Sequence, residues 1–254
     1  MDSSIRKPFQ GVWNIIRFNW HYYVLSAAIV VLIFVLQHYF YSLSVAANIL
    51  VLLIVCSTLI SLAVSSYIYD FSDLYKLSWL DSLKYGEREI IINIHAGFDE
   101  TSKLLRKRFE AYELVVADFY DPIKHTEISI KRARKVYPPF PNTQQVSTKY
   151  LPIQDNSADK IFTILSAHEI RNNQERVIFF KELQRVLKPS GQVIVTEHLR
   201  DKANFLAYNI GFFHFHSKAT WLKTFHLSGL CVSKEIKTTP FITTFILEKN
   251  GTAS

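Results

Sequence analysis

Side chains that can transfer protons follow two apolar runs in the second half of the chain. His168 and Glu169 come soon after the run Ile161–Leu165, and Glu197 and His198 follow the next apolar run. Short apolar runs bounded by turn signals are typical of buried strands. Histidine titrates near neutrality, so His168 can serve as a general base towards a phenol or hydroxyl, with Glu169 orienting its ring. The alternative is that His168 only caps the strand or contacts a cofactor.

A helix is expected between these two strands. Apolar residues recur on one face of Asn172–Leu187, and Lys188–Gly191 (KPSG) ends that pattern. A strand, a helix, a tight stop and a second strand form a βαβ unit, whose strands are parallel with a right-handed crossover. Ligands of such sheets bind at the carboxyl ends of the strands. We therefore expect the polar residues that follow the strands to share one site.

Five further strands are expected around this unit. We place them at Glu89–Ile94, Leu114–Ala117, Gln145–Thr148, Leu230–Ile236 and Phe241–Glu248, between turn signals. The last two are predicted to pair antiparallel through the turn Lys237–Pro240. Helices are expected at Glu100–Tyr112, His125–Tyr137 and Lys218–Leu227, with a helical region from Lys202.

The stretch Leu151–His198 resembles the second half of the class I S-adenosylmethionine-dependent methyltransferases, of the methyltransferase type 11 kind. The resemblance rests on Leu151, Pro152, Asp155, Ser157, Asp159, Glu182, Leu183, Arg185, Val186, Leu187, Lys188, Pro189, Gly191 and Glu197. It covers about two thirds of the chain, from Glu87 to Lys249. It implies an α/β fold, a doubly wound seven-stranded Rossmann-like methyltransferase domain, with S-adenosylmethionine as the cofactor.

The resemblance also implies a glycine-rich turn after the first strand, where this sequence keeps one glycine. The family pattern is acid-x-Gly-x-Gly-x-Gly, whereas the chain has NIHAGFD from Asn93 to Asp99. Gly97 remains, while His95 and Asp99 place bulk where the backbone has to lie close to the cofactor. Asn93 can hydrogen-bond the methionine amino group without a carboxylate's charge. The sequence leaves open whether cofactor binding is retained, altered or lost. It also leaves open that this is an ordinary βα turn.

Three more cofactor-binding residues are expected from the same resemblance. Asp118 ends the second strand, where the family's acid accepts hydrogen bonds from both ribose hydroxyls; the alternative is a strand-end cap. Ser147 stands where the family often has an acid that meets the adenine amino group. Ser166, after the fourth strand, is expected to line the same site.

Histidines near the end of the chain also raise the question of a metal. Glu197, His198, His214 and His216 are the residues concerned. His214 and His216 lie in an aromatic run that is more simply an aromatic pocket or a membrane-facing lip. Because the carboxylate spacing does not converge on them, we expect no metal site.

The N-terminal part is dominated by a span without Asp, Glu, Lys or Arg, from Phe18 to Tyr69. It contains two apolar runs of about the 20 residues that a helix needs to cross a bilayer. We expect residues 1–20 as a cytoplasmic segment, 21–69 as a transmembrane helical hairpin, 70–88 as an amphipathic linker and 89–254 as the methyltransferase-like domain. A buried soluble hairpin is the alternative, and a signal peptide fits poorly because a second run follows the first.

Charge fixes the expected orientation. Arg6, Lys7 and Arg17 precede the first run, and Lys76 and Lys84 follow the second. The positive-inside rule then predicts a multi-pass protein of the inner (cytoplasmic) membrane, with its soluble domain facing the cytoplasm. Two cysteines in unlike contexts favour a reducing compartment.

The net charge of +7 fits nucleic acid or an anionic membrane surface. We expect no nucleic-acid partner, because the chain has no recognised binding module. The basic cluster from Lys124 to Lys135 suits lipid phosphates or a solvated helix face equally.

Together these features predict a membrane-anchored methyltransferase acting on a hydrophobic acceptor: a lipid, a quinone-like ring or an aryl-polyene. Its partners are expected to be membrane lipid or a lipophilic small molecule. The alternative is a catalytically inactive methyltransferase-fold scaffold at the membrane, and a weaker one is a different nucleotide-type ligand. The acceptor, the methylated atom and the oligomeric state stay open.

Overall fold

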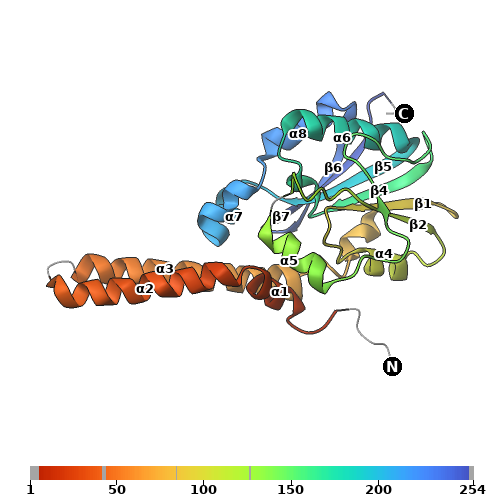
Figure 1. Cartoon of the computed structure of the whole chain (residues 1–254). Helices are drawn as coiled ribbons and strands as arrows, with labels where there is room; N and C mark the ends of the chain where they lie inside the picture. Colours follow the sequence, from red (N-terminus) through yellow and green to blue (C-terminus); the bar gives the residue numbers. More distant parts are fainter. Residues whose placement is uncertain (1–5, 42–43, 84, 126, 252–254) are drawn as a thin grey trace.

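An α/β domain and a long helical arm make up the chain (Figure 1). The computed structural model describes residues 6–41, 44–83, 85–125 and 127–251. The first five residues of the predicted N-terminal segment, and Lys84, therefore lie outside the described residues. The arm consists of α2 (Trp20–Tyr39) and α3 (Ser44–Ser66), and α3 runs on into a π-helical turn, η2 (Tyr67–Phe71).

The domain is built on one seven-stranded sheet with the order β3-β2-β1-β4-β5-β7-β6. The strands are β1 (Ile90–His95), β2 (Glu113–Asp118), β3 (Gln144–Gln145), β4 (Ala158–Ile164), β5 (Leu187–His198), β6 (Leu230–Thr239) and β7 (Ile242–Lys249). β7 runs antiparallel to its neighbours, β5 and β6, and the other strand pairs within the described residues are parallel. The predicted mostly parallel sheet with a terminal antiparallel hairpin is confirmed.

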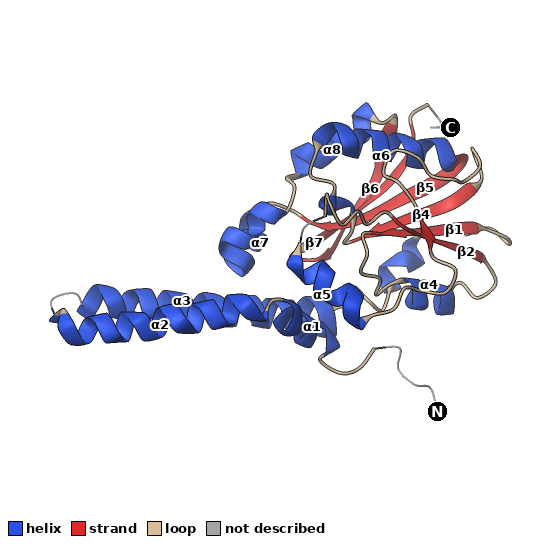
Figure 2. Cartoon of the chain, in the orientation of Figure 1, coloured by secondary structure: helices blue, strands red, loops and turns tan. Residues whose placement is uncertain are grey.

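Helices cover both faces of the sheet (Figure 2). On one face lie α6 (Asn173–Val186) and α8 (Lys218–Leu227), and on the other lies α4 (Ser102–Arg108). Successive strand residues point to opposite faces, so Ile92 packs with the α6 and α8 side chains and Ile91 with the α4 side. Both faces of the central strands are buried, which explains why most of their residues are apolar.

The boundaries of several elements differ from the predictions. The helix predicted from Glu100 to Tyr112 is the shorter α4, and the basic helix α5 covers Ile128–Val136. The predicted stop, Lys188–Gly191, forms a bulge inside β5, since Ala158 pairs with Leu187 and Lys160 with Gln192. A Cβ on Gly191 would lie 2.7 Å from a Leu187 methyl and 2.9 Å from the Ala158 carbonyl oxygen, so the bulge requires glycine.

The linker predicted as one amphipathic segment folds as turns and a short 3-10 helix, η3 (Ser78–Ser82). Leu77 has a φ of 58°, a left-handed conformation that interrupts a helix. Leu74, Leu77 and Leu80 are nonetheless buried, and the last two pack against the α4 face of the sheet. The segment therefore serves as a cover for that face.

A helix that the sequence did not indicate, α1 (Gln10–Phe18), lies at the base of the arm. It packs against α3, η2 and α5. Beyond this base the arm projects from the domain, and side chains along α2 and α3 are largely exposed (Figure 1). By length and composition both helices can cross a membrane. The 3-10 helix η4 (Ala167–Glu169) follows β4, and α7 (Lys202–Tyr208) and η5 (Asn209–His214) follow β5. Of these, α7 contacts α3.

Candidate functional site

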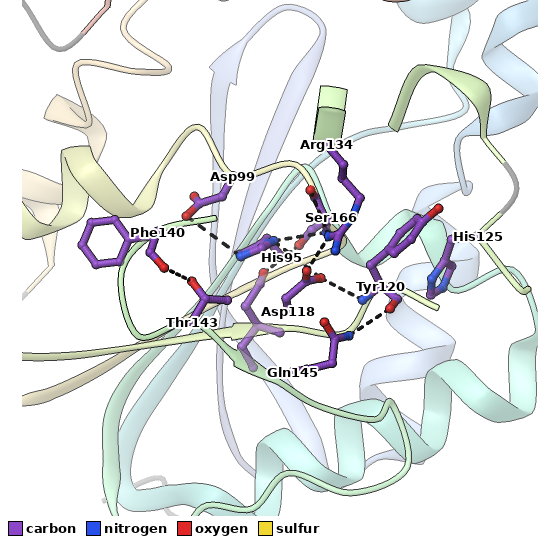
Figure 3. A network of polar contacts seen from close by, with 12 residues as sticks. His95, Asp99, Asp118, Tyr120, His125, Arg134, Phe140, Thr143, Gln145 and Ser166 are labelled. Atoms are coloured by element: carbon purple, nitrogen blue, oxygen red, sulfur yellow. Dashed lines mark hydrogen bonds and ion pairs between the residues drawn. The ribbon is translucent and has the colours of Figure 1, made fainter. Parts of the chain in front are cut away.

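The carboxyl ends of β1 and β2 form one end of the site (Figure 3). Gly97 follows β1 with a φ of +90°, the backbone conformation for which the family's turn uses glycine. Asp118 ends β2 and is buried, and its Oδ1 accepts a hydrogen bond from the Tyr120 backbone N–H at 2.8 Å. The structure thus brings together two of the predicted cofactor-binding residues, which lie far apart in the sequence.

An arginine that was not predicted occupies the space between them. Arg134 of α5 donates from Nη1 to Asp118 Oδ2 at 2.5 Å and to the Gly97 carbonyl oxygen at 3.2 Å. Its guanidinium carbon lies 4.4 Å from the centre of the Tyr120 ring. A Cβ on Gly97 would lie 2.8 Å from Nη1. The guanidinium therefore covers the Asp118 carboxylate that a ribose would need.

Asn93 and His95 lie in β1 and are both buried. Asn93 donates to Thr101 Oγ1 (3.0 Å) and Ser102 Oγ (2.8 Å), while His95 Nδ1 accepts from the Gly97 N–H at 3.1 Å. Asn93 Oδ1 and His95 Nε2 are among the buried polar atoms of the described residues that lack a hydrogen-bond partner. Such orphaned atoms leave room for a polar ligand group at this turn.

The bulky side chains of His95 and Phe98, on either side of Gly97, do not fill the site. Phe98 turns away and packs on Phe18 and Tyr137, with ring centres 5.7 Å and 5.3 Å apart. His95 stays in the strand, where burial lowers its pKa against the raising effect of Asp99 and Asp118. It is therefore neutral at pH 7, and Arg134 is the group that fills the site.

A cavity of about 400 Å³ opens beside Arg134, within the size range of small-molecule sites. Tyr120, His125, Gln145, Ser147 and Glu175 are among the residues that line it. Ser147 is exposed there, as an adenine contact would require. By contrast, Ser166 is buried and its hydroxyl donates to the Ile94 carbonyl oxygen at 2.9 Å, so it ties β4 to β1. The polar groups of Asn93, Asp118 and Ser147 fit S-adenosylmethionine once Arg134 turns away from Asp118.

A second cluster lies at the carboxyl ends of β4 and β5. His168 Nδ1 lies 2.6 Å from Glu197 Oε2, and its Nε2 lies 3.2 Å from Glu169 Oε1. The His168 backbone N–H donates to Glu197 Oε1 at 3.1 Å. Burial lowers the pKa of His168, but the two carboxylates outweigh it and raise the pKa to about 10. At neutral pH this imidazole is held as a cation, so it has no free nitrogen to accept a proton.

The four residues considered for a metal do not converge on one point: Glu197 and His214 both lie beside His168, whereas His198 and His216 have other partners. His198 Nδ1 lies 3.0 Å from the Asn204 amide oxygen, and its Nε2 lies 2.9 Å from the Tyr69 hydroxyl. The imidazole therefore donates to Asn204 and accepts from Tyr69. Burial lowers its pKa to about 4. His216 contacts the buried Arg176 at 3.0 Å, and burial lowers its pKa to about 3.

Sequence reasoning missed three contributors: Arg134, Tyr69 and Glu127. Arg134 belongs to a basic helix, whose charge pattern is the same whether the helix faces solvent or a site. Tyr69 ends the uncharged apolar span, where an aromatic residue is typical of a membrane interface. Glu127 lies 3.1 Å from His214 Nδ1. No local signal links any of them to its partner, since the partners lie between 16 and 129 residues away.

Comparison with known proteins agrees with this fold. Residues 94–195 match the family described as a methyltransferase domain. A SAM-dependent methyltransferase from Aquifex aeolicus superposes with a TM-score of 0.52 at 16% identity, covering 75% of this chain and 97% of that one. The PH0226 protein from Pyrococcus horikoshii superposes with a TM-score of 0.51 at 17% identity, covering 70% and 89%.

A third structure, a putative methyltransferase of Haloferax volcanii in complex with the Trm112 methyltransferase activator, gives a TM-score of 0.51 at 12% identity. It covers 72% of this chain and 91% of that one. No curated protein sequence matches the chain. At these identities the superpositions establish the fold.

The strand order, the turn at Gly97, Asp118 and the matched domain define the class. The chain has the fold of the class I S-adenosylmethionine-dependent methyltransferases, and residues 94–195 match the methyltransferase domain, which supports S-adenosylmethionine as the cofactor. Within that class, its domain has a single glycine in the first turn and is preceded by two long apolar helices.

Proposed function

We propose that the chain is a membrane-anchored methyltransferase that transfers a methyl group from S-adenosylmethionine to a hydrophobic acceptor. The observation that carries the proposal is the junction between the arm and the sheet. Tyr69, at the end of the second apolar helix, hydrogen-bonds His198 at the end of β5. The arm thus ends at the edge of the sheet where ligands of this fold bind. An acceptor dissolved in a bilayer around the arm has a short path to that edge.

Exposed apolar side chains beside the arm support the same substrate class. Phe205 and Leu206 in α7, and Ile210 and Phe213 in η5, are between 47% and 83% exposed. Because α7 contacts α3, these side chains continue the apolar surface of the arm. Apolar patches of this kind mark membrane or ligand contact. We assign α7 and η5 as a lip that lies in the bilayer surface.

The sequence's charge pattern supports an orientation with the domain on the cytoplasmic side of an inner membrane. Arg17 ends α1 just before the first apolar helix, and no charged residue lies between there and Asp70. Lys76 follows the second helix. Lipids, quinone-like rings and aryl-polyenes are the acceptors that fit this arrangement.

S-adenosylmethionine supplies the electrophilic methyl group when it is bound. The protein's part is to hold the acceptor in line with that methyl, which by itself accounts for a large share of such a reaction's rate. Asp118 is assigned to the ribose hydroxyls, and Asn93 Oδ1, which is unpartnered, to the methionine amino group. His168 stays a candidate base, but as a cation between two carboxylates it serves better as a hydrogen-bond donor at neutral pH.

The test is methyl transfer from methyl-labelled S-adenosylmethionine. The purified full chain in detergent is incubated with a total bacterial lipid extract, and label is counted in the organic phase. We expect label there with the wild type and at least a tenfold lower yield with Asp118→Ala. Label found only in a water-soluble acceptor would reject the hydrophobic acceptor, but methyl transfer itself would still stand.

One observation favours a scaffold as a second candidate: Arg134 is ion-paired with the carboxylate that the cofactor needs. Binding calorimetry separates the two candidates. Micromolar S-adenosylmethionine binding that Asp118→Ala abolishes supports the enzyme. No binding at millimolar cofactor leaves the fold and makes the scaffold the better assignment.

A further inference from the structure

We propose that His168, Glu169 and His214 form a binding site for one divalent transition-metal ion, with Zn²⁺, Co²⁺ and Mn²⁺ as the fitting ions. The three side chains come from the loop after β4 and from η5, and their ligand atoms all lie within 4.8 Å of one another. Two imidazoles and a carboxylate are a common donor set for these metals.

The distances suit a shared ion. Glu169 Oε1 lies 3.2 Å from His168 Nε2 and 3.2 Å from His214 Nε2. Metal–nitrogen and metal–oxygen bonds of about 2.0–2.1 Å place the ligands of a tetrahedral ion about 3.4 Å apart. The carboxylate oxygen is therefore already near the correct separation from both imidazole nitrogens, and a small shift of η5 brings His214 into the shell.

Both histidines are also oriented by a second carboxylate on the far side of the ring. His168 Nδ1 lies 2.6 Å from Glu197 Oε2, and His214 Nδ1 lies 3.1 Å from Glu127 Oε1. Histidines that bind metals almost always donate their other ring N–H to a carboxylate or carbonyl, which fixes the tautomer and leaves the far nitrogen for the ion. Here both Nδ1 atoms face carboxylates and both Nε2 atoms face Glu169, while Arg171 Nη2 also contacts both ring nitrogens of His214 and would have to leave Nε2 to the ion.

Charge and burial agree with a bound cation. Glu197 is fully buried and Glu169 is 6% exposed. Carboxylates so far from water need a positive partner, which is the His168 imidazolium in the free protein and would be the ion once its binding displaces the Nε2 proton. The competing cation is Arg171, whose guanidinium contacts the His214 ring. That side chain lies on the exposed side of the cluster, so it can move away when an ion binds.

The site's position gives it a role only if the proposed methyl transfer holds. It lies at the ends of β4 and β5, where the acceptor is assigned. A metal there lowers the pKa of a hydroxyl that it binds and so prepares the oxygen for methylation. The binding test below uses neither cofactor nor acceptor, so its result is independent of that function.

The experiment titrates Co²⁺ and Zn²⁺ into the full chain in detergent after treatment with a chelator. Bound metal is measured by elemental analysis, and Co²⁺ coordination by visible absorption. We expect one ion per chain. His214→Ala should weaken binding at least a hundredfold, and Glu127→Gln by about 10–100-fold through loss of orientation. Arg171→Gln should tighten it.

The control is His226→Ala, which removes an exposed histidine at the end of α8 and should change nothing. His214 and Glu127 are partly exposed, so their variants are expected to fold, and circular dichroism and thermal unfolding check this. Wild-type binding no stronger than that of folded His214→Ala overturns the metal site. So does unchanged metal affinity in both folded His214→Ala and Glu127→Gln.

Discussion

At the scale of single residues, Arg134 is the side chain on which cofactor binding depends most. It forms a 2.5 Å ion pair with Asp118, lies against Gly97 and covers the Tyr120 ring. A hydrogen bond between charged groups contributes about 1.5–3 kcal/mol, and a ligand that needs Asp118 has to break it first. The loss of the other glycines from the first turn is therefore less of an obstacle to cofactor binding than this arginine.

From this follows a prediction for Arg134→Gln. The variant removes the competing charge and should bind S-adenosylmethionine about tenfold more tightly or better, since each 1.4 kcal/mol is a factor of ten. Calorimetry on the detergent-solubilised chain measures it. Lys135→Gln, one residue further along the same helix, serves as the control and should not change the affinity. Weaker binding by Arg134→Gln would show instead that the arginine contacts the cofactor.

At the scale of elements, the N-terminus of α1 is capped by a residue from the end of the arm. The Asp70 carboxylate accepts from the backbone N–H groups of Gly11 (2.7 Å) and Val12 (2.8 Å). Its own N-cap, Phe9, has no side-chain oxygen to offer. Gly11 has to be glycine here, since a Cβ would lie 2.3 Å from the Tyr69 Cβ. The cap therefore fastens α1 to the base of the arm.

We expect Asp70→Ala to lower the free energy of unfolding by about 1–2 kcal/mol, the usual loss for a helix cap. The measurements are thermal unfolding in detergent and the rate of protease cleavage within α1, which should rise. Asp73→Ala removes an exposed ion pair with Lys76 and is the matched control, with little change expected. Equal effects of the two substitutions would contradict the capping role.

The helix α5 connects the arm to the cofactor site. Arg132 donates to the Phe18 carbonyl oxygen at 2.5 Å and Tyr137 to the Asn14 amide oxygen at 2.9 Å, while Arg134 reaches Asp118. The same nine-residue helix thus contacts the base of the arm and the site. Its position relative to β2 decides whether Arg134 lies over Asp118.

At the scale of the whole molecule, the exposed apolar arm calls for an apolar environment. We predict that the full chain stays in the membrane pellet after alkaline carbonate extraction. Leu32→Arg together with Leu53→Arg should release it, because each arginine at the centre of a span costs about 2.5–3.5 kcal/mol. Both leucines are exposed, at 55% and 61%, so the domain's packing is not affected.

Ile178→Arg, on the exposed face of α6, is the control for this prediction and should leave the chain in the pellet. Release of the wild-type chain by carbonate would contradict a membrane-spanning arm. It would indicate that another protein covers the two helices.

The sequence by itself determined the sheet and the arm. Apolar runs with turn signals between them predicted the positions of six strands, and the uncharged span predicted two long helices, because both signals are local and need only periodicity and length. The predicted third strand, Gln145–Thr148, overlaps β3 at Gln145 alone. The sequence also indicated the carboxyl ends of the strands as the site. The sequence did not predict helix α1 or the turns of the linker, because short segments take their conformation from the elements against which they pack.

Only the tertiary structure decided which charged side chains meet. Arg134 covers Asp118 because α5 packs on α1, and His168 lies between Glu169 and Glu197 because β4 and β5 are neighbours. His214 joins that cluster, whereas His198 turns to Tyr69 of the arm. Such contacts depend on how whole elements are placed against one another, and the residue pattern within each element carries no information about that placement.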